Sequence, residues 1–152
     1  MRHHHLIPVI LFCASALITF TSCSNSSDNP ADLTPTVIQN NVQTGEWKIT
    51  SYIDSGKDET SHFIGYFFTF GSNGTISATN NSVNYAGTWS ITDSNTNDDS
   101  PGVMDFTILF SLGNDFDKLS EDWQILSQTS KRIELKHVSG GNGGTDFLTF
   151  EK

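Results

Sequence analysis

Apolar and polar residues alternate with a period of two along most of the chain after residue 45. Between Ile64 and Phe70, for example, every second residue is apolar, and the run Gly71-Ser72-Asn73-Gly74 ends this segment. Such alternation is typical of half-buried β-strands, and clusters of Gly, Asn, Asp or Pro mark the turns between them. Only residues 114–123 offer a helical turn. The sequence therefore predicts an all-β domain over residues 45–152.

About eight short strands are expected in this domain. They centre on the apolar runs Trp47 to Ile53, Ile64 to Phe70, Ile76 to Ala78, Tyr85 to Ile91, Met104 to Phe110, Trp123 to Ile125, Arg132 to Val138 and Phe147 to Phe150. Short connections favour an up-and-down antiparallel order, and closing such a sheet into a β-barrel removes its exposed edges. A barrel of eight strands is just wide enough inside for side chains or one small ligand.

The first 44 residues follow a different pattern. Arg2 and three histidines precede an almost wholly apolar run from Leu6 to Phe20. A basic start, a short apolar run and small residues before a cleavage site are typical of an export signal, and a membrane span would need roughly 20 apolar residues. The following residues are rich in Ser, Asn, Asp and Pro, as flexible linkers are. The expected organisation is a signal peptide at 1–22, an acylated cysteine and flexible tether at 23–44, and one domain at 45–152.

The end of the apolar run indicates how the mature chain begins. Phe20-Thr21-Ser22-Cys23 resembles the lipobox of bacterial lipoproteins, with Phe20 where Leu is usual. The resemblance implies cleavage before Cys23 and a lipid on its thiol, whose acyl chains hold the protein on a membrane. Ser24 after the cysteine implies, by resemblance to Gram-negative lipoproteins, sorting to the outer membrane, with the leaflet left open. The alternative is cleavage after Ala14-Ser15-Ala16, which would leave Cys23 free in a soluble protein.

The charge balance is acidic, with 17 Asp and Glu against 8 Lys and Arg and a net charge of −9. Nucleic-acid binding needs a clustered basic surface, so no nucleic-acid partner is expected. The 11 Phe, 3 Trp and 3 Tyr argue for a folded domain, because disordered chains are poor in aromatic residues. Since Cys13 lies in the signal and Cys23 is assigned to lipid attachment, no disulfide is expected in the domain.

Two segments share the pattern Gly-x-Trp-x-Ile-Thr, one beginning at Gly45 with Trp47 and one at Gly87 with Trp89. The first resembles the Gly-x-Trp signature of lipocalins, whose Trp closes one end of the barrel. Four pieces in this order are similar to the lipocalin-like domains of bacterial outer-membrane lipoproteins: Phe68-Thr69-Phe70, Gly87-Thr88-Trp89, Leu119 with Trp123, and the ending from Phe147 to Lys152. The resemblance implies a barrel and, in classical lipocalins, the binding of small apolar molecules.

Lipocalins also place an Arg near the last strand, stacked over the signature Trp, whereas Lys152 ends the last strand here. The repeated pattern itself has two interpretations. It reflects either a duplication of four strands or two glycines that each relieve strand curvature where a Trp packs behind them.

The apolar face of the predicted strands is the candidate binding site. The residues expected to line the interior are Tyr66, Phe68, Phe106, Ile108 and Trp123. They form either a packed core or a partly open pocket for a small apolar or amphipathic molecule. Phe63 and Phe67 fall on the opposite face, where an exposed aromatic pair would mark a partner surface.

The sequence offers little catalytic or metal chemistry. The mature chain has only His62 and His137, neither in a recognised nucleophilic context, and no residue spacing suits zinc. The run Asp93 to Asp99 offers oxygens at alternate positions, as a calcium loop does, but Asp98 stands where such a loop needs Gly. A solvated polar loop remains the alternative. No enzyme activity, catalytic residue or cofactor is predicted.

Two functions follow from these observations. The first is a lipid-anchored envelope lipoprotein whose lipocalin-like barrel binds a small apolar or amphipathic ligand. The alternative is a non-enzymatic scaffold that binds a protein or glycan at the cell envelope through its loops or outer face.

Overall fold

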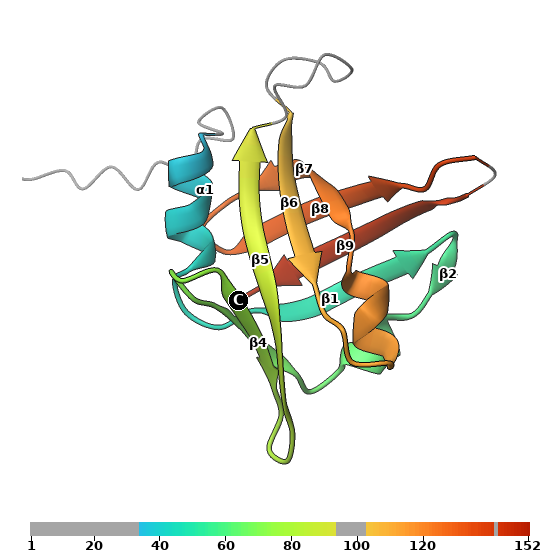
Figure 1. Cartoon of the computed structure of the whole chain (residues 1–152), viewed down its shortest axis with the longest axis horizontal. Coiled ribbons are helices and arrows are strands. Elements are labelled where there is room, and N and C mark those ends of the chain that lie inside the picture. The colour runs from blue at the N-terminus through green and yellow to red at the C-terminus, as the bar shows by residue number, and fades with distance from the viewer. Residues whose placement is uncertain (1–33, 94–102, 142) are drawn as a thin grey trace, which may run out of the picture.

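The computed structural model describes residues 34–93, 103–141 and 143–152, which form a curled antiparallel sheet of nine strands with one short α-helix (Figure 1). The strands are β1 (Lys48–Asp54), β2 (Lys57–Asp58), β3 (Phe67–Phe70), β4 (Thr75–Thr79), β5 (Asn84–Asp93), β6 (Met104–Leu109), β7 (Asp122–Gln128), β8 (Arg132–Val138) and β9 (Thr145–Glu151). The all-β prediction is confirmed. The eight expected strands are all present, and the two-residue β2 is additional.

The sheet follows the chain in a simple order. Each strand from β3 to β9 pairs with the next one, and β9 then pairs with β1, which also pairs with β2. A bridge joins the two sides of the curled sheet, because Trp47 and Phe68 exchange two backbone hydrogen bonds with N–O distances of 2.9 and 2.7 Å. The residue that precedes β1 thus meets β3 across the curl.

Large side chains fill the inner face of the sheet. Trp47, Phe68, Phe106, Trp123 and Phe150 are fully buried and come from five different parts of the sheet. Most outward positions on their strands are polar, and Phe67, Leu109, Leu126 and Phe147 are exposed apolar exceptions. Burial of these rings is the main force that curls the sheet, because each turns apolar surface away from water.

The helix α1 (Pro35–Val42) packs against one side of the curled sheet (Figure 1). Thr34 caps it by accepting a hydrogen bond from the amide of Val37, and Pro35 occupies the first turn. Ile38 and Val42 lie one turn apart and are fully buried. The prediction of a flexible tether over 23–44 is therefore wrong for residues 35–42, where two apolar side chains suffice to dock a helix. Cys23, the signal peptide and residues 94–99 of the possible calcium loop lie outside the described residues.

Two 3₁₀ helices, η1 (Thr60–Phe63) and η2 (Asp115–Leu119), lie next to each other at the side of the sheet opposite α1 (Figure 1). The helical turn predicted within 114–123 is confirmed by η2. Ile64 was expected on a strand but is 72% exposed, because Gly65 with φ +86° turns the chain before β3 begins. The described part of the chain contains no helix with the length and apolar character that crossing a bilayer requires.

The two signature glycines serve different purposes. Gly45 has φ +73°, a conformation that favours glycine, and a Cβ atom there would have space. Gly87 lies inside β5, where a Cβ atom would come within 2.3 Å of the carbonyl oxygen of Leu109. Gly87 therefore allows a close approach of two strands beside Trp89. The curvature interpretation therefore fits Gly87 but not Gly45, which lies before β1.

Candidate functional site

The five residues predicted to line the interior all contribute to the inner side of the sheet. Phe68, Phe106, Ile108 and Trp123 are at most 1% exposed, and Tyr66 is partly buried against the core. Phe106 and Trp123 are direct cross-strand partners, and Ile108 pairs with Trp89. The sheet thus brings four of the five together, while Tyr66 lies just before β3 at its edge.

These side chains are in contact with other rings. The ring centroids of Phe68 and Phe150 are 5.3 Å apart, and those of Phe70 and Phe106 are 5.5 Å apart. Both pairs lie in the range for favourable aromatic packing. The contacts favour the packed-core interpretation of this face. A ligand on these five residues stays a prediction.

Phe116 of η2 closes the aromatic interior next to Tyr66. Its ring centroid lies between 4.8 and 6.0 Å from those of five other aromatic residues: Phe63, Tyr66, Phe68, Tyr85 and Phe110. We call these six residues the Phe116 cluster. Phe63 is buried in it and is not exposed beside Phe67, so the two do not form the partner surface considered from the sequence. From the sequence, Phe116 was expected only as part of a helical turn, because the residues that pack against it come from distant segments.

A charged network joins η1 to η2. His62 lies between two carboxylates, with its Nε2 atom 2.8 Å from Glu59 and its Nδ1 atom 2.6 Å from Asp115. A hydrogen bond from Lys57 holds the pKa of Glu59 below its usual range, and one from His62 does the same for Asp115. Since Glu59 is only 5% exposed, these partners compensate a nearly buried carboxylate. The network fastens the end of the sheet where Phe116 lies.

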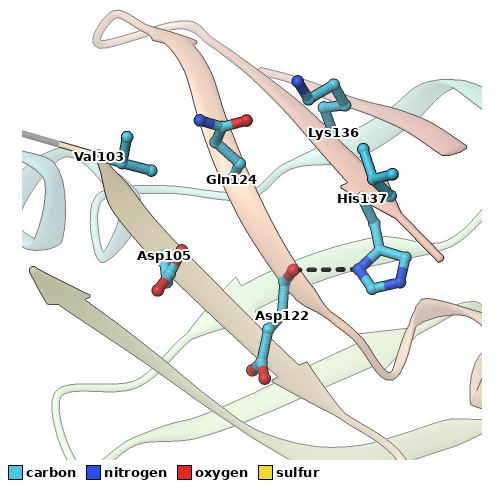
Figure 2. A pocket seen from close by; sticks show the side chains of 7 residues that line it. Val103, Asp105, Asp122, Gln124, Lys136 and His137 are labelled. Carbon is cyan, nitrogen blue, oxygen red and sulfur yellow. Dashed lines mark hydrogen bonds between the residues drawn. The ribbon is translucent and has the colours of Figure 1, made fainter. Parts of the chain in front are cut away.

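An open hollow lies on the outer face of β6, β7 and β8 (Figure 2). Its volume is about 440 Å³, and its lining residues are Val103, Asp105, Asp122, Gln124, Lys136, His137 and Val138. We call this the outer hollow. Antiparallel pairing explains why these side chains meet, because Asp105 is directly opposite Gln124, which in turn is opposite Lys136. A smaller hollow of about 230 Å³ adjoins it at Asp122.

His137 is held at the rim of the outer hollow. Its Nδ1 atom is 3.2 Å from the backbone oxygen of Asp122 (Figure 2). Its Nε2 atom is 3.4 Å from a carboxylate oxygen of Glu121. Its ring also meets Trp123 edge-on, with centroids 6.0 Å apart. The imidazole is thus positioned by three contacts. Along β8, His137 follows the buried Ile133 and Leu135 at every second position, so it lies on the same face of the strand.

The chemistry of the outer hollow is that of a polar binding surface. It combines carboxylate and amide acceptors with amide, ammonium and imidazole donors, and it includes two valines. No Ser, Thr or Cys nucleophile is among its lining residues. Within the described residues, no group of three or more His, Cys, Asp and Glu side chains is arranged to hold a metal ion.

No protein-family model matches the chain, and no curated protein is significantly similar to it in sequence.

Proposed function

We propose that the protein is a lipid-anchored lipoprotein of the outer membrane whose lipocalin-like barrel is a non-enzymatic binding module. In this proposal its ligand binds in the outer hollow rather than in the interior. The lipobox-like sequence ending at Cys23 supports the anchor. The acyl chains would keep the domain at the membrane while leaving its outer face accessible.

Three features at the start of the sheet support the lipocalin-like assignment. Trp47 is fully buried, and its indole donates a hydrogen bond of 2.8 Å to the backbone oxygen of Val42 at the end of α1. The bridge to Phe68 joins the start of the sheet to β3. Lys152 lies over the Trp47 ring, which is the place that the resemblance gives to an Arg.

The observation that carries the proposal is the contrast between the two faces of the sheet. Inside, aromatic rings contact one another at the positions expected to hold a ligand. Outside, a hollow of about 440 Å³ presents polar groups from three adjacent strands. This volume lies within the range of small-molecule sites, which is roughly 300 to 1,000 Å³.

The interior stays the second candidate because of one feature. Tyr66 and Tyr85 stack with centroids 5.9 Å apart and are only partly buried. They border Phe116, so an apolar ligand could enter there if η2 moved its ring aside.

Hydrogen–deuterium exchange of the acylated protein, with and without an extract of its cell envelope, tests the proposal. We expect slower exchange in peptides that cover β6, β7 and β8. Protection confined to η1, η2 and β3 would contradict the outer site and support the interior. A Gln124→Ala variant should lose the protection, and an Asn84→Ala variant on β5 serves as a matched exposed amide control.

A further inference from the structure

Four outward side chains form a continuous row across neighbouring strands. Asp105 on β6 is opposite Gln124 on β7, Gln124 is opposite Lys136 on β8, and Lys136 is opposite Phe147 on β9. We call these four residues the outer row. Neighbouring strands are about 4.8 Å apart, so the row runs perpendicular to the strands for roughly 14 Å. The first three residues line the outer hollow, and Phe147 lies beside Lys136 on the next strand.

Phe147 is an exposed ring at the end of a polar track. It is 42% exposed, whereas its neighbours Leu148 and Phe150 on β9 are fully buried. A single exposed apolar side chain is ordinary on a protein surface. Here, however, it adjoins the outer hollow through Lys136, so one ligand could contact the ring and the polar side chains together.

The polar members of the row offer both donors and acceptors. The amide of Gln124 offers both a donor and an acceptor, and the ammonium of Lys136 offers donors. Asp105 adds a half-buried carboxylate that accepts hydrogen bonds. A negative group and a positive group thus flank a neutral amide. This arrangement suits a ligand without net charge that carries many hydroxyl groups.

We propose that the outer row binds a neutral, linear glycan lying across the strands. The spacing of strands is close to the length of one pyranose unit, so successive sugar units would meet successive side chains. The apolar face of one sugar would stack on Phe147, while vicinal hydroxyls of the others would pair with Gln124 and Asp105. A polyanionic chain is disfavoured, because Asp122 and Asp105 both line the outer hollow.

This inference rests on the proposed function, since it names the ligand class of the same outer face. Binding of the acylated protein in liposomes to an array of neutral linear hexasaccharides tests it, with heparin as the polyanion. We expect at least one neutral hexasaccharide to bind and heparin not to bind. Phe147→Ala and Gln124→Ala should each weaken the bound hexasaccharide about five-fold or more, as the loss of one contact of about 1 kcal/mol implies.

Phe67→Ala is the matched control for Phe147→Ala. Phe67 is similarly exposed, at 37%, but it lies on β3. Its substitution should leave the affinity within about two-fold, which is less than the effect of one hydrogen bond. Circular dichroism of each variant checks that the fold is retained.

The remaining outcomes separate this inference from the proposed function. If no neutral hexasaccharide binds but an envelope extract still protects β6 to β8, the glycan is excluded and the outer site stands. If that protection depends on protein in the extract, the ligand is a protein and the glycan inference is overturned. If a hexasaccharide binds equally well to the Phe147→Ala and Gln124→Ala variants, the outer row is not its site.

Discussion

The ammonium of Lys152 lies 4.4 Å from the centroid of the Trp47 ring. This contact joins the last residue of the chain to the residue that precedes the first strand. The same ammonium also donates to the backbone oxygen of Asn41 in α1, at 3.3 Å. One cation thus connects the C-terminus, the signature tryptophan and the helix.

Removing this cation should destabilise the domain. Lys152→Met keeps the length of the side chain but loses the attraction to the Trp47 ring, so the free energy of unfolding should fall by about 1 kcal/mol. Lys152→Arg should retain it, because a guanidinium also stacks on aromatic rings. Urea unfolding followed by tryptophan fluorescence measures both. Equal stability of the methionine variant and the wild type would show that the contact contributes nothing.

The network between η1 and η2 predicts a dependence on acid. The hydrogen bond from His62 lowers the pKa of Asp115 in the folded state, so this carboxylate stabilises the fold above its unfolded pKa of about 3.9. The stabilisation is lost as the pH falls through the lower, folded value. Asp115→Asn should therefore lose less stability than the wild type between about pH 6 and about pH 3.

Urea unfolding at both pH values checks this, with Glu46→Gln, outside the network, as the control. Parallel losses of stability in the wild type and Asp115→Asn would refute a role for the pair.

Alanine should be tolerated differently at the two signature glycines. At Gly87 a Cβ atom would meet the backbone oxygen of Leu109, and such overpacking costs about 3 kcal/mol. At Gly45 only the left-handed backbone conformation opposes alanine, at a cost of about 1 kcal/mol. The urea concentrations at which Gly87→Ala and Gly45→Ala are half unfolded compare these costs directly. A larger effect at Gly45 would mean that the packing around Gly87 adjusts freely.

Phe116 should be the most sensitive aromatic residue outside the strands. Its replacement by alanine would leave a cavity among five other rings, and such substitutions cost about 3 to 5 kcal/mol. Phe67→Ala is the control, since Phe67 is exposed and lies under the ammonium of Lys48. Thermal unfolding of both variants gives the comparison. If the unfolding temperature falls no further for Phe116→Ala than for Phe67→Ala, η2 does not close the interior.

The proposed anchor depends on one thiol. Cys23→Ala removes the site of acylation, so the protein should move from the membrane fraction to the soluble fraction. Immunoblots of the two fractions measure the change, and Ser24→Ala is a neighbouring control. Retention of the alanine variant on membranes would require another means of attachment.

The sequence predicted most strands because alternating buried and less buried positions are kept in β3, β4 and β6 and in most of β8, whereas β1 and β7 contain bulges. It missed α1, although Thr34-Pro35 is a typical helix start and Ile38 and Val42 are one turn apart. An eight-residue helix rich in Asn and Gln has few apolar positions, so its composition resembled a linker.

The candidate site was harder to predict from the sequence than the strands were. The outer row depends on which residues face one another across four strands, and a bulge in β7 shifts that register. Asp105 and Phe147 are 42 residues apart in the sequence and meet only through two intervening strands. The same limit applies to the Phe116 cluster, which joins η1, η2 and β5.

Native mass spectrometry of the acylated protein, extracted gently from its own membrane, tests the central claim most directly. The claim is that aromatic side chains fill the interior and leave binding to the outer face. The predicted result is a mass equal to that of the acylated chain, with no apolar molecule bound in a one-to-one ratio. A stoichiometric apolar molecule that is lost on Phe106→Trp, which enlarges an inner ring, would contradict the account.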